Sequence, residues 1–250
     1  MHKYFVFTIF QLRMLLKNFK LSLLGLLMPI LSFYIFYGLM KDINLQNNIP
    51  ITEYLLPAFL IIIVCNAVLN IFGDYYIAYE ESGALIQYRT LGLGKYTIIF
   101  AIFSAVLIFE ALVTFALLLF SHYISDISIP FSNFFNIVIA LLLINLYQLS
   151  ISLLLSTFSG KTSSYTSIAL LIFNFQMFLG GLTFPPEILP DYLSFITKHF
   201  NPIYFGLVLM RGVWVEGKNV FDYPKEIGLL IFISLVFLVL SNIIAKKREV

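Results

Sequence analysis

The chain has 250 residues, of which 60% are hydrophobic and only 11% are charged, and its mean hydropathy is +0.96. These values exclude an ordinary soluble domain and predict an integral membrane protein. The net charge of +2 is too small to indicate a nucleic-acid partner, and none is expected.

Six windows of the sequence are apolar and long enough to cross a bilayer. A hydrocarbon core of about 30 Å requires ~20 apolar residues in a helix. The alternating pattern of a membrane β-barrel is absent. The sequence therefore predicts an all-α integral membrane protein with six transmembrane helices in a single domain, residues 1–250. The windows are 21–40, 54–73, 96–120, 127–160, 162–186 and 227–245.

Ahead of the first window, residues 2–19 form a predicted amphipathic helix. Phe5, Ile9, Leu12 and Leu16 recur at three- and four-residue steps, while the cations of this segment gather on another face. Such a pattern is typical of a helix that lies in the membrane interface. The alternative is a simple extension of the first span.

Between the second and third windows, residues 74–95 form a charged loop that contains YEESGALIQYRTLGLGK. Its GLGK ending is similar to a nucleotide-binding P-loop, but that motif needs glycine at position 89 and Ser or Thr at position 96. Arg89 and Tyr96 occupy these positions. The loop is therefore not expected to bind a nucleotide.

Glu110 is the one charged residue inside the third window. A carboxylate at this depth is costly and usually faces the bundle interior or a watery path. Glu110 is either a proton or substrate site, or an interhelical hydrogen-bond partner of Asn145 or Gln148. Asn66 and Asn70 share a helix face, as Asn145 and Gln148 do, and such pairs either line a conduit or join helices.

After the fifth window, residues 185–226 are too apolar to leave the membrane and too broken to span it. Pro185 and Pro186 are expected to end the fifth span, because the residue before a proline is disfavoured in a helix. Asn201 and Pro202 predict the N-cap and first residue of a short helix. We therefore expect short re-entrant helices between spans five and six.

The basic residues predict the orientation of the chain. Ten of the 15 Lys and Arg residues lie at the two ends of the chain, in the 74–95 loop or in the loop after span four. By the positive-inside rule both termini are cytoplasmic, and residues 185–226 are extracellular.

Gly180 and Gly181 are small enough to let helices approach closely. Together with the re-entrant backbone behind them, they predict an extracellular gate that forms part of a homodimer seam. The residues assigned to this gate and seam are Gly180, Gly181, Phe184, Pro185, Glu187, Pro190, Asn201 and Pro202.

No residues are expected to perform catalysis in this chain. The three histidines lie in loops or at a terminus, no hydrolase or metalloprotease motif occurs, and Cys65 is the single cysteine. We expect no enzyme activity, no metal site and no bound cofactor.

Two stretches of the chain resemble the ABC-2 type exporter permease family. The first is the loop YEESGALIQYRTLGLGK, and the second is GGLTFPPEILPDYLSFITKHFNPIYFGLVLMRG at 180–212. With six spans and an amphipathic N-terminus, the resemblance covers nearly the whole chain. The matching positions are Glu81, Gly83, Leu85, Arg89, Thr90, Gly181, Phe184, Pro185, Glu187, Leu189, Pro190, Asn201, Pro202 and Arg211.

The resemblance implies that residues 75–90 form a cytoplasmic coupling helix seated in a groove of a separate ATP-binding subunit. That subunit would bind ATP and Mg, and two copies of each chain would assemble in the plasma membrane of a bacterium. The residues implied in coupling are Glu80, Glu81, Gly83, Leu85, Arg89 and Thr90.

The leading hypothesis is therefore the permease subunit of an ATP-driven exporter. Its 27 Phe and 15 Tyr residues favour an amphipathic or hydrophobic substrate, such as a peptide or drug-like molecule. Two alternatives stay open, namely an ion-coupled secondary transporter that uses Glu110, and a membrane scaffold or immunity protein that transports nothing.

Overall fold

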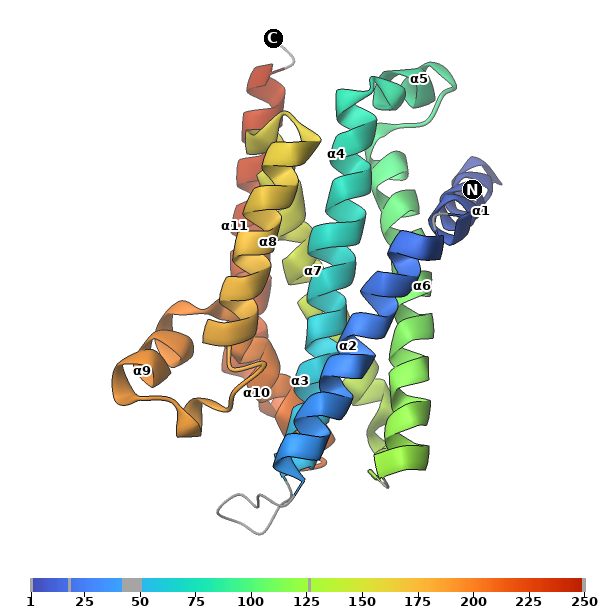
Figure 1. The fold of residues 1–250 in the computed structure, drawn as a ribbon. Coiled ribbons are helices and arrows are strands. Elements are labelled where there is room, and N and C mark those ends of the chain that lie inside the picture. Colours follow the sequence, from blue (N-terminus) through green and yellow to red (C-terminus); the bar gives the residue numbers. More distant parts are fainter. Residues whose placement is uncertain (1, 18, 42–50, 126, 249–250) are drawn as a thin grey trace.

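The computed structural model of the chain describes residues 2–17, 19–41, 51–125 and 127–248. These residues form helices joined by short links, and no strand occurs among them (Figure 1). The all-α prediction is therefore confirmed. The elements are α1 His2–Lys17, α2 Phe19–Met40, α3 Ile51–Cys65, η1 Asn66–Phe72, α4 Gly73–Glu81, α5 Ala84–Thr90, α6 Lys95–Ser125, η2 Phe131–Asn133, α7 Phe134–Ser159, α8 Thr162–Leu179, η3 Pro186–Ile188, α9 Asp191–Phe200, α10 Pro202–Trp214, η4 Val220–Asp222 and α11 Pro224–Arg248.

The centre of the molecule is one long helical rod made of α3, η1 and α4. Its middle part, η1, is π-helical, so the rod passes from α to π and back to α geometry. Most side chains from Leu55 to Phe72 are buried. A helix that is apolar on all sides needs neighbours on all sides. Accordingly α2, α6, α7, α8 and α10 all pack against the rod.

The helices α1 and α11 lie on the outside of the bundle. α11 packs on α7 and α10 but leaves Phe232, Leu235 and Val239 exposed. α1 packs on α6, and Figure 1 views it almost end-on, whereas α2 and α6 run along the bundle. α1 is therefore a separate crossing helix and not an extension of α2. Its place in the membrane interface stays a prediction.

Within the part of the chain that the structure describes, four helices are long and apolar enough to cross a membrane, namely Tyr54–Glu81, Lys95–Ile124, Phe131–Ser159 and Pro224–Lys246. They correspond to four of the six predicted spans. In α2, the part whose side chains the structure describes contributes the shorter apolar stretch Met28–Met40. α8 begins with six consecutive hydroxyl-bearing residues, which lower its hydropathy. Both helices nevertheless run beside the others in Figure 1.

Two predicted helix boundaries are wrong. The second span does not end at residue 73, because the helix continues to Glu81. Asp74 can lie inside this helix because its carboxylate accepts a hydrogen bond from Thr166 Oγ1 at 2.8 Å. The predicted fifth span, α8, ends at Leu179, well before Pro185 and Pro186. The reason is that Gly181 adopts a φ of 76°, in the left-handed region that commonly ends helices.

The single coupling helix expected over residues 75–90 is also corrected. Residues up to Glu81 belong to α4, and a new helix, α5, begins after Gly83. Gly83 has a φ of 74°, and this left-handed conformation breaks the helix. Glycine adopts it readily, whereas other residues are strained there.

Figure 1 shows α5, the C-terminal part of α11 and the turn between α7 and α8 at one end of the bundle, with α1 beside them. This end is called the α5 end below. The links from α6 to α7 and from α10 to α11 lie toward the opposite end.

Candidate functional site

The helix α5 presents one face to the protein and another to the surroundings. Leu85 is only 8% exposed and packs into the core, whereas Ile86 and Leu91 are 67% and 69% exposed. Exposed apolar side chains in a membrane protein contact either lipid or another protein. The exposed residues of α5 and the turn after it are Ile86, Gln87, Arg89, Thr90, Leu91 and Gly92.

The inner face of α5 is held by α1. The Phe7 and Tyr88 rings meet edge to face with their centroids 4.8 Å apart, and Tyr88 also contacts Tyr79 at 5.6 Å. The Tyr79 hydroxyl donates to Gln11 Oε1 at 2.8 Å. The predicted apolar stripe of α1 is exposed at Phe5, Ile9 and Leu16. A second stripe, at Phe7, Gln11 and Leu15, is buried, and the sequence analysis missed it.

Glu81 joins the end of α4 to the start of α8. Its Oε2 atom accepts hydrogen bonds from the Thr162 backbone N–H at 2.8 Å and from Thr162 Oγ1 at 2.6 Å. The first N–H groups of a helix have no intrahelical partner, and a carboxylate there is favoured by the helix dipole. Glu81 therefore supplies α8 with an N-terminal cap from another helix.

Further polar contacts join α8 to the central rod. Tyr165 is fully buried, and its hydroxyl donates to the Leu69 carbonyl at 2.8 Å and lies 2.7 Å from Ser152 Oγ. A Cβ atom at Gly73 would overlap the Tyr165 ring, so glycine permits this close approach. We call the contacts Glu81–Thr162, Asp74–Thr166 and Leu69–Tyr165 the α4–α8 ladder.

Sequence reasoning did not find this ladder. The signal was available in the run KTSSYTS at 161–167, which places hydroxyl groups at the start of a predicted span. Such groups are expensive in lipid unless they find partners. Their partners, however, come from residues some 80 to 100 positions away in the chain and cannot be read from the sequence.

The predicted intramembrane polar residues separate into three groups. Asn145 Nδ2 donates to Glu110 Oε1 at 2.9 Å and to the Leu141 carbonyl at 3.1 Å. Gln148 was the other partner predicted for Glu110. Its Nε2 instead donates to Cys65 Sγ at 3.0 Å and to Gln176 Oε1 at 3.1 Å. Gln148 therefore links α7 to α3 and α8.

The third group lies within η1. Asn70 Nδ2 donates to Asn66 Oδ1 at 2.9 Å, so these two amides are partners on one helix face. π-Helical segments are rare and occur frequently at functional sites. This one contains Leu69, where the α4–α8 ladder begins, and is followed directly by Gly73.

Gly180 and Gly181 make close contacts within the chain. A Cβ atom at Gly180 would lie 2.4 Å from Ile203 Cγ2, and one at Gly181 would lie 3.1 Å from Leu207 Cδ2. Both neighbours belong to α10. The close approach that these glycines permit is therefore between the segment that follows α8 and the helix α10. It gives no support to the prediction that they face a second copy.

The other residues of the predicted gate differ in exposure. Asn201 is 1% exposed; it caps α10 by accepting from the Ile203 N–H at 3.3 Å, and Pro202 is the first residue of that helix. This predicted helix start is confirmed. The Phe184 ring lies 6.0 Å from that of Phe36, and Pro185 is buried, whereas Glu187 and Pro190 are exposed.

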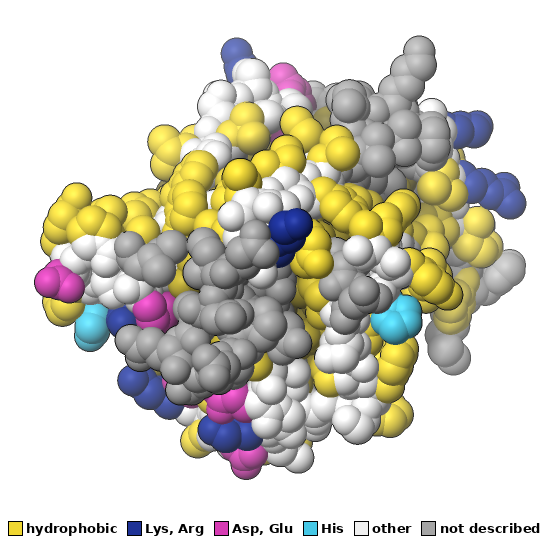
Figure 2. All heavy atoms as spheres, turned by 60° about the horizontal axis from the view of Figure 1, so that its bottom comes forward, with side chains coloured by type: hydrophobic (Ala, Val, Ile, Leu, Met, Phe, Trp, Pro, Cys, Tyr) yellow, Lys and Arg dark blue, Asp and Glu magenta, His cyan; other side chains and the backbone are white. Residues whose placement is uncertain are grey.

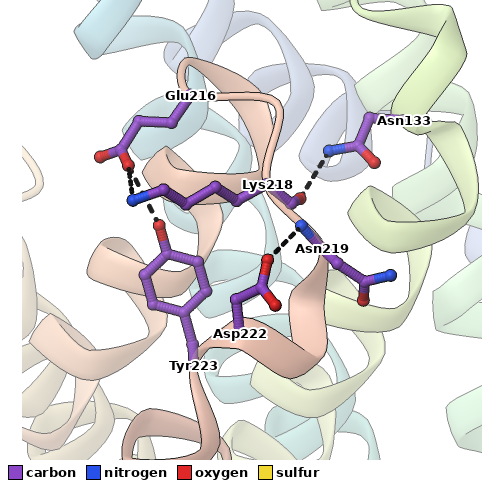
Figure 3. Close-up of polar contacts among 6 residues, drawn as sticks. All are labelled: Asn133, Glu216, Lys218, Asn219, Asp222 and Tyr223. Carbon is purple, nitrogen blue, oxygen red and sulfur yellow. Dashed lines mark hydrogen bonds and ion pairs between the residues drawn. The ribbon is translucent and has the colours of Figure 1, made fainter.

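A polar loop fastens the far end of α10 to α7 (Figure 3). Asn133 Nδ2 donates to the Val213 carbonyl at 2.7 Å and to the Lys218 carbonyl at 2.9 Å. Lys218 Nζ lies 2.6 Å from Glu216 Oε2, and this hydrogen bond raises the pKa of the Lys218 ammonium above its usual value. The loop orders the connection between the short helix α10 and α11.

Figure 2 views the end of the molecule opposite α5. Yellow hydrophobic side chains cover much of the described part of this face. Acidic and basic side chains lie together at its left and lower edge, and further basic side chains lie at the right and near the centre. Phe200 and Phe221 are 68% and 71% exposed. Among the residues that the structure describes, no three His, Cys, Asp or Glu side chains come together as a metal site requires.

The chain was compared with known proteins. The family model described as ABC-2 type transporter matches residues 2–215, which is most of the chain. No curated protein matches it. The chain therefore belongs to the ABC-2 type transporter family, the multi-pass membrane permeases that work with a separate ATP-binding subunit.

Proposed function

We propose that this chain is the permease subunit of an ATP-driven exporter and that α5 docks on the ATP-binding subunit. The observation that carries the proposal is the two-sided character of α5. On its inner side Tyr88 contacts Phe7 of α1 and Leu85 packs into the core, while Ile86, Arg89 and Leu91 are exposed at the end of the bundle. A short helix that is rigidly held yet exposed can transmit a push from a partner.

Charge and apolar surface have separate roles in this docking. Ile86 and Leu91 supply the apolar contact area, whose burial favours association. Glu80 and Arg89 are exposed near them and carry opposite charges. Charge complementarity fixes the register of two partners more than it adds affinity. ATP and Mg bind the partner subunit in this proposal, and this chain supplies no catalytic group.

The α4–α8 ladder provides a route for the motion. Glu81 ends α4, immediately before the glycine turn that leads to α5, and it caps α8 at Thr162. A displacement of α5 therefore acts on two neighbouring helices together. Inside the bundle, Tyr165 ties α8 to the π-helical segment of the central rod.

The remaining parts of the proposal concern assembly and cargo. α2 and α8 complete a set of six spans, and the α5 end with both termini faces the cytoplasm of a bacterium. Two copies pair around the α8–α10 region and export an amphipathic or hydrophobic substrate. Membership in the ABC-2 family favours this function over an ion-coupled carrier or a scaffold.

The test compares two charge reversals at the α5 end. Arg89→Glu changes an exposed cation of α5, and Lys161→Glu makes the same change in the exposed turn between α7 and α8. We expect R89E to reduce co-purification with the ATP-binding subunit and its stimulated ATPase rate about tenfold, since a like-charge contact costs more than 1 kcal/mol. K161E retains both. Equal association of R89E and K161E would contradict docking through α5.

A further inference from the structure

A groove of ≈ 540 Å³ lies between α6 and α7. This volume is within the range of about 300–1,000 Å³ that is typical of small-molecule sites. Its walls are almost wholly apolar, and aromatic side chains stand at Phe115, Phe131 and Phe134. The groove therefore suits a ligand with an apolar body.

Three polar residues line this apolar groove, namely Glu110, Thr114 and Asn145, and the first and last of them each have a buried oxygen atom without a partner among the described residues. Glu110 Oε1 accepts from Asn145 Nδ2, but no residue that the structure describes donates to Glu110 Oε2. Asn145 uses its amide nitrogen on Glu110 and on the Leu141 carbonyl, and its Oδ1 likewise lacks a donor. Glu110 is 5% exposed. Leaving buried acceptors unsatisfied is costly, and the cost is larger for a charged group.

The missing partner has a defined chemistry. A carboxylate and an amide oxygen are both hydrogen-bond acceptors, so the complementary group is a donor, and a positive charge strengthens its bond to Glu110. Among the described residues, no Lys, Arg or His side chain lines the groove to supply such a donor. An apolar wall with two acceptors therefore selects an apolar molecule that carries an ammonium group.

We propose that the α6/α7 groove binds lipophilic amines, with the ammonium group donating to Glu110 and Asn145. The two acceptor oxygens lie just beneath the groove surface, and a side-chain rotation brings them to the ligand, as polar contacts often tighten only in a complex. The proposal adds a ligand class to the proposed function. That the bound amine is a transported substrate rests on the proposed function. Binding itself is a property of this chain alone.

The chain contains a built-in reporter of this site. Trp214 is its single tryptophan, and it lines the groove. Bromine quenches tryptophan fluorescence on contact. We would therefore titrate the purified chain in phosphatidylcholine nanodiscs with ω-bromododecylamine and, as the neutral comparison, with ω-bromododecanol. Partition of each probe into the bilayer is common to all variants, so differences between variants report the groove.

Three variants complete the experiment. Glu110→Gln removes the charge but keeps an oxygen that can accept from Asn145, and Glu226→Gln makes the same change outside the groove. Ala111→Phe fills the groove from an exposed position. We expect E110Q to weaken amine binding about tenfold, the low end for a charge-assisted hydrogen bond, and to weaken alcohol binding less, because the hydroxyl donor carries no charge. E226Q has no effect, and A111F abolishes quenching by both probes.

Two results would overturn the proposal. Equal affinities for amine and alcohol in the wild type would show a lipid-filled groove without selection for a cation. Undiminished quenching in A111F would place the probe elsewhere, and this outcome is informative even if E110Q fails to fold. Neither result touches the docking of α5, because the chain is titrated without the ATP-binding subunit.

Discussion

Glu81 and Thr162 are 81 positions apart in the sequence, and a single carboxylate oxygen of Glu81 accepts hydrogen bonds from both the backbone N–H and the hydroxyl of Thr162. The resemblance to exporter permeases implied that Glu81 contacts the ATP-binding subunit. The structure gives this carboxylate a partner within the chain. Its position just before α5 nevertheless keeps it on the route between the docking helix and the bundle.

The first prediction concerns this contact. Thr162→Val removes the hydroxyl donor but keeps the backbone N–H, whereas Glu81→Ala removes the acceptor of both bonds. We expect a graded loss of ATPase stimulation, larger in E81A than in T162V, and faster hydrogen exchange in the first turn of α8. Association with the ATP-binding subunit is retained, because α5 itself is unchanged.

The double mutant provides the control for this contact. If both residues act through one contact, E81A/T162V is no worse than E81A, because interacting residues are not additive. Additive losses would show that Glu81 and Thr162 act independently and would remove the α4–α8 ladder from the coupling route.

The second prediction tests the buried part of the ladder. Tyr165→Phe deletes a hydroxyl that bonds the Leu69 carbonyl and Ser152. We expect a loss of about 1–3 kcal/mol in the free energy of unfolding, because buried polar groups are left without a partner. Thermal unfolding in detergent measures it as a fall in Tm. Tyr123→Phe is the matched control, since Tyr123 is 77% exposed. Equal Tm values for the two variants would contradict the role assigned to Tyr165.

The helical class and several elements of this fold can be predicted from the sequence, because they depend on local features. Apolar length predicts the spans at Lys95–Ile124 and Pro224–Lys246, and the N-cap chemistry of Asn201 and Pro202 predicts the start of α10. The hydrogen bond between Glu110 and Asn145 was one of two predicted pairings. Each of these depends on residue type and spacing alone.

Other features depend on contacts between distant residues. The charged residues Asp74 and Glu81 predict a loop. In the structure Asp74 accepts a hydrogen bond from Thr166 and Glu81 accepts one from Thr162, and α4 remains helical. The sequence of residues 66–72 does not predict a π-helix. The Leu69 carbonyl of this segment accepts a hydrogen bond from Tyr165, which lies in the distant helix α8. The sequence predicts which residues are costly to bury, but the fold decides which partners they find.

The last prediction concerns the proposed homodimer seam, for which the structure selects the positions to test. Within residues 180–190, Glu187 and Pro190 are exposed, whereas Leu182 is 1% exposed and packs in the core. Across a two-fold axis the same surface of each copy meets its equivalent, so residues near the axis approach their own counterparts. Cys65 is buried, and its replacement by Ala gives a background without cysteine.

In that background we expect Glu187→Cys or Pro190→Cys to form a disulfide-linked dimer on mild oxidation, and Leu182→Cys to remain monomeric on denaturing gels. A disulfide requires Cα atoms within about 7 Å, so a bond reports close approach of the two copies at that position. The complex must first be shown by mass photometry to contain two copies. Absence of a bond at both exposed positions in such a complex would place the seam elsewhere. The exposed apolar face of α11, with Phe232 and Leu235, would then be the next surface to test, since apolar helix faces in a membrane protein pack either on lipid or on another helix.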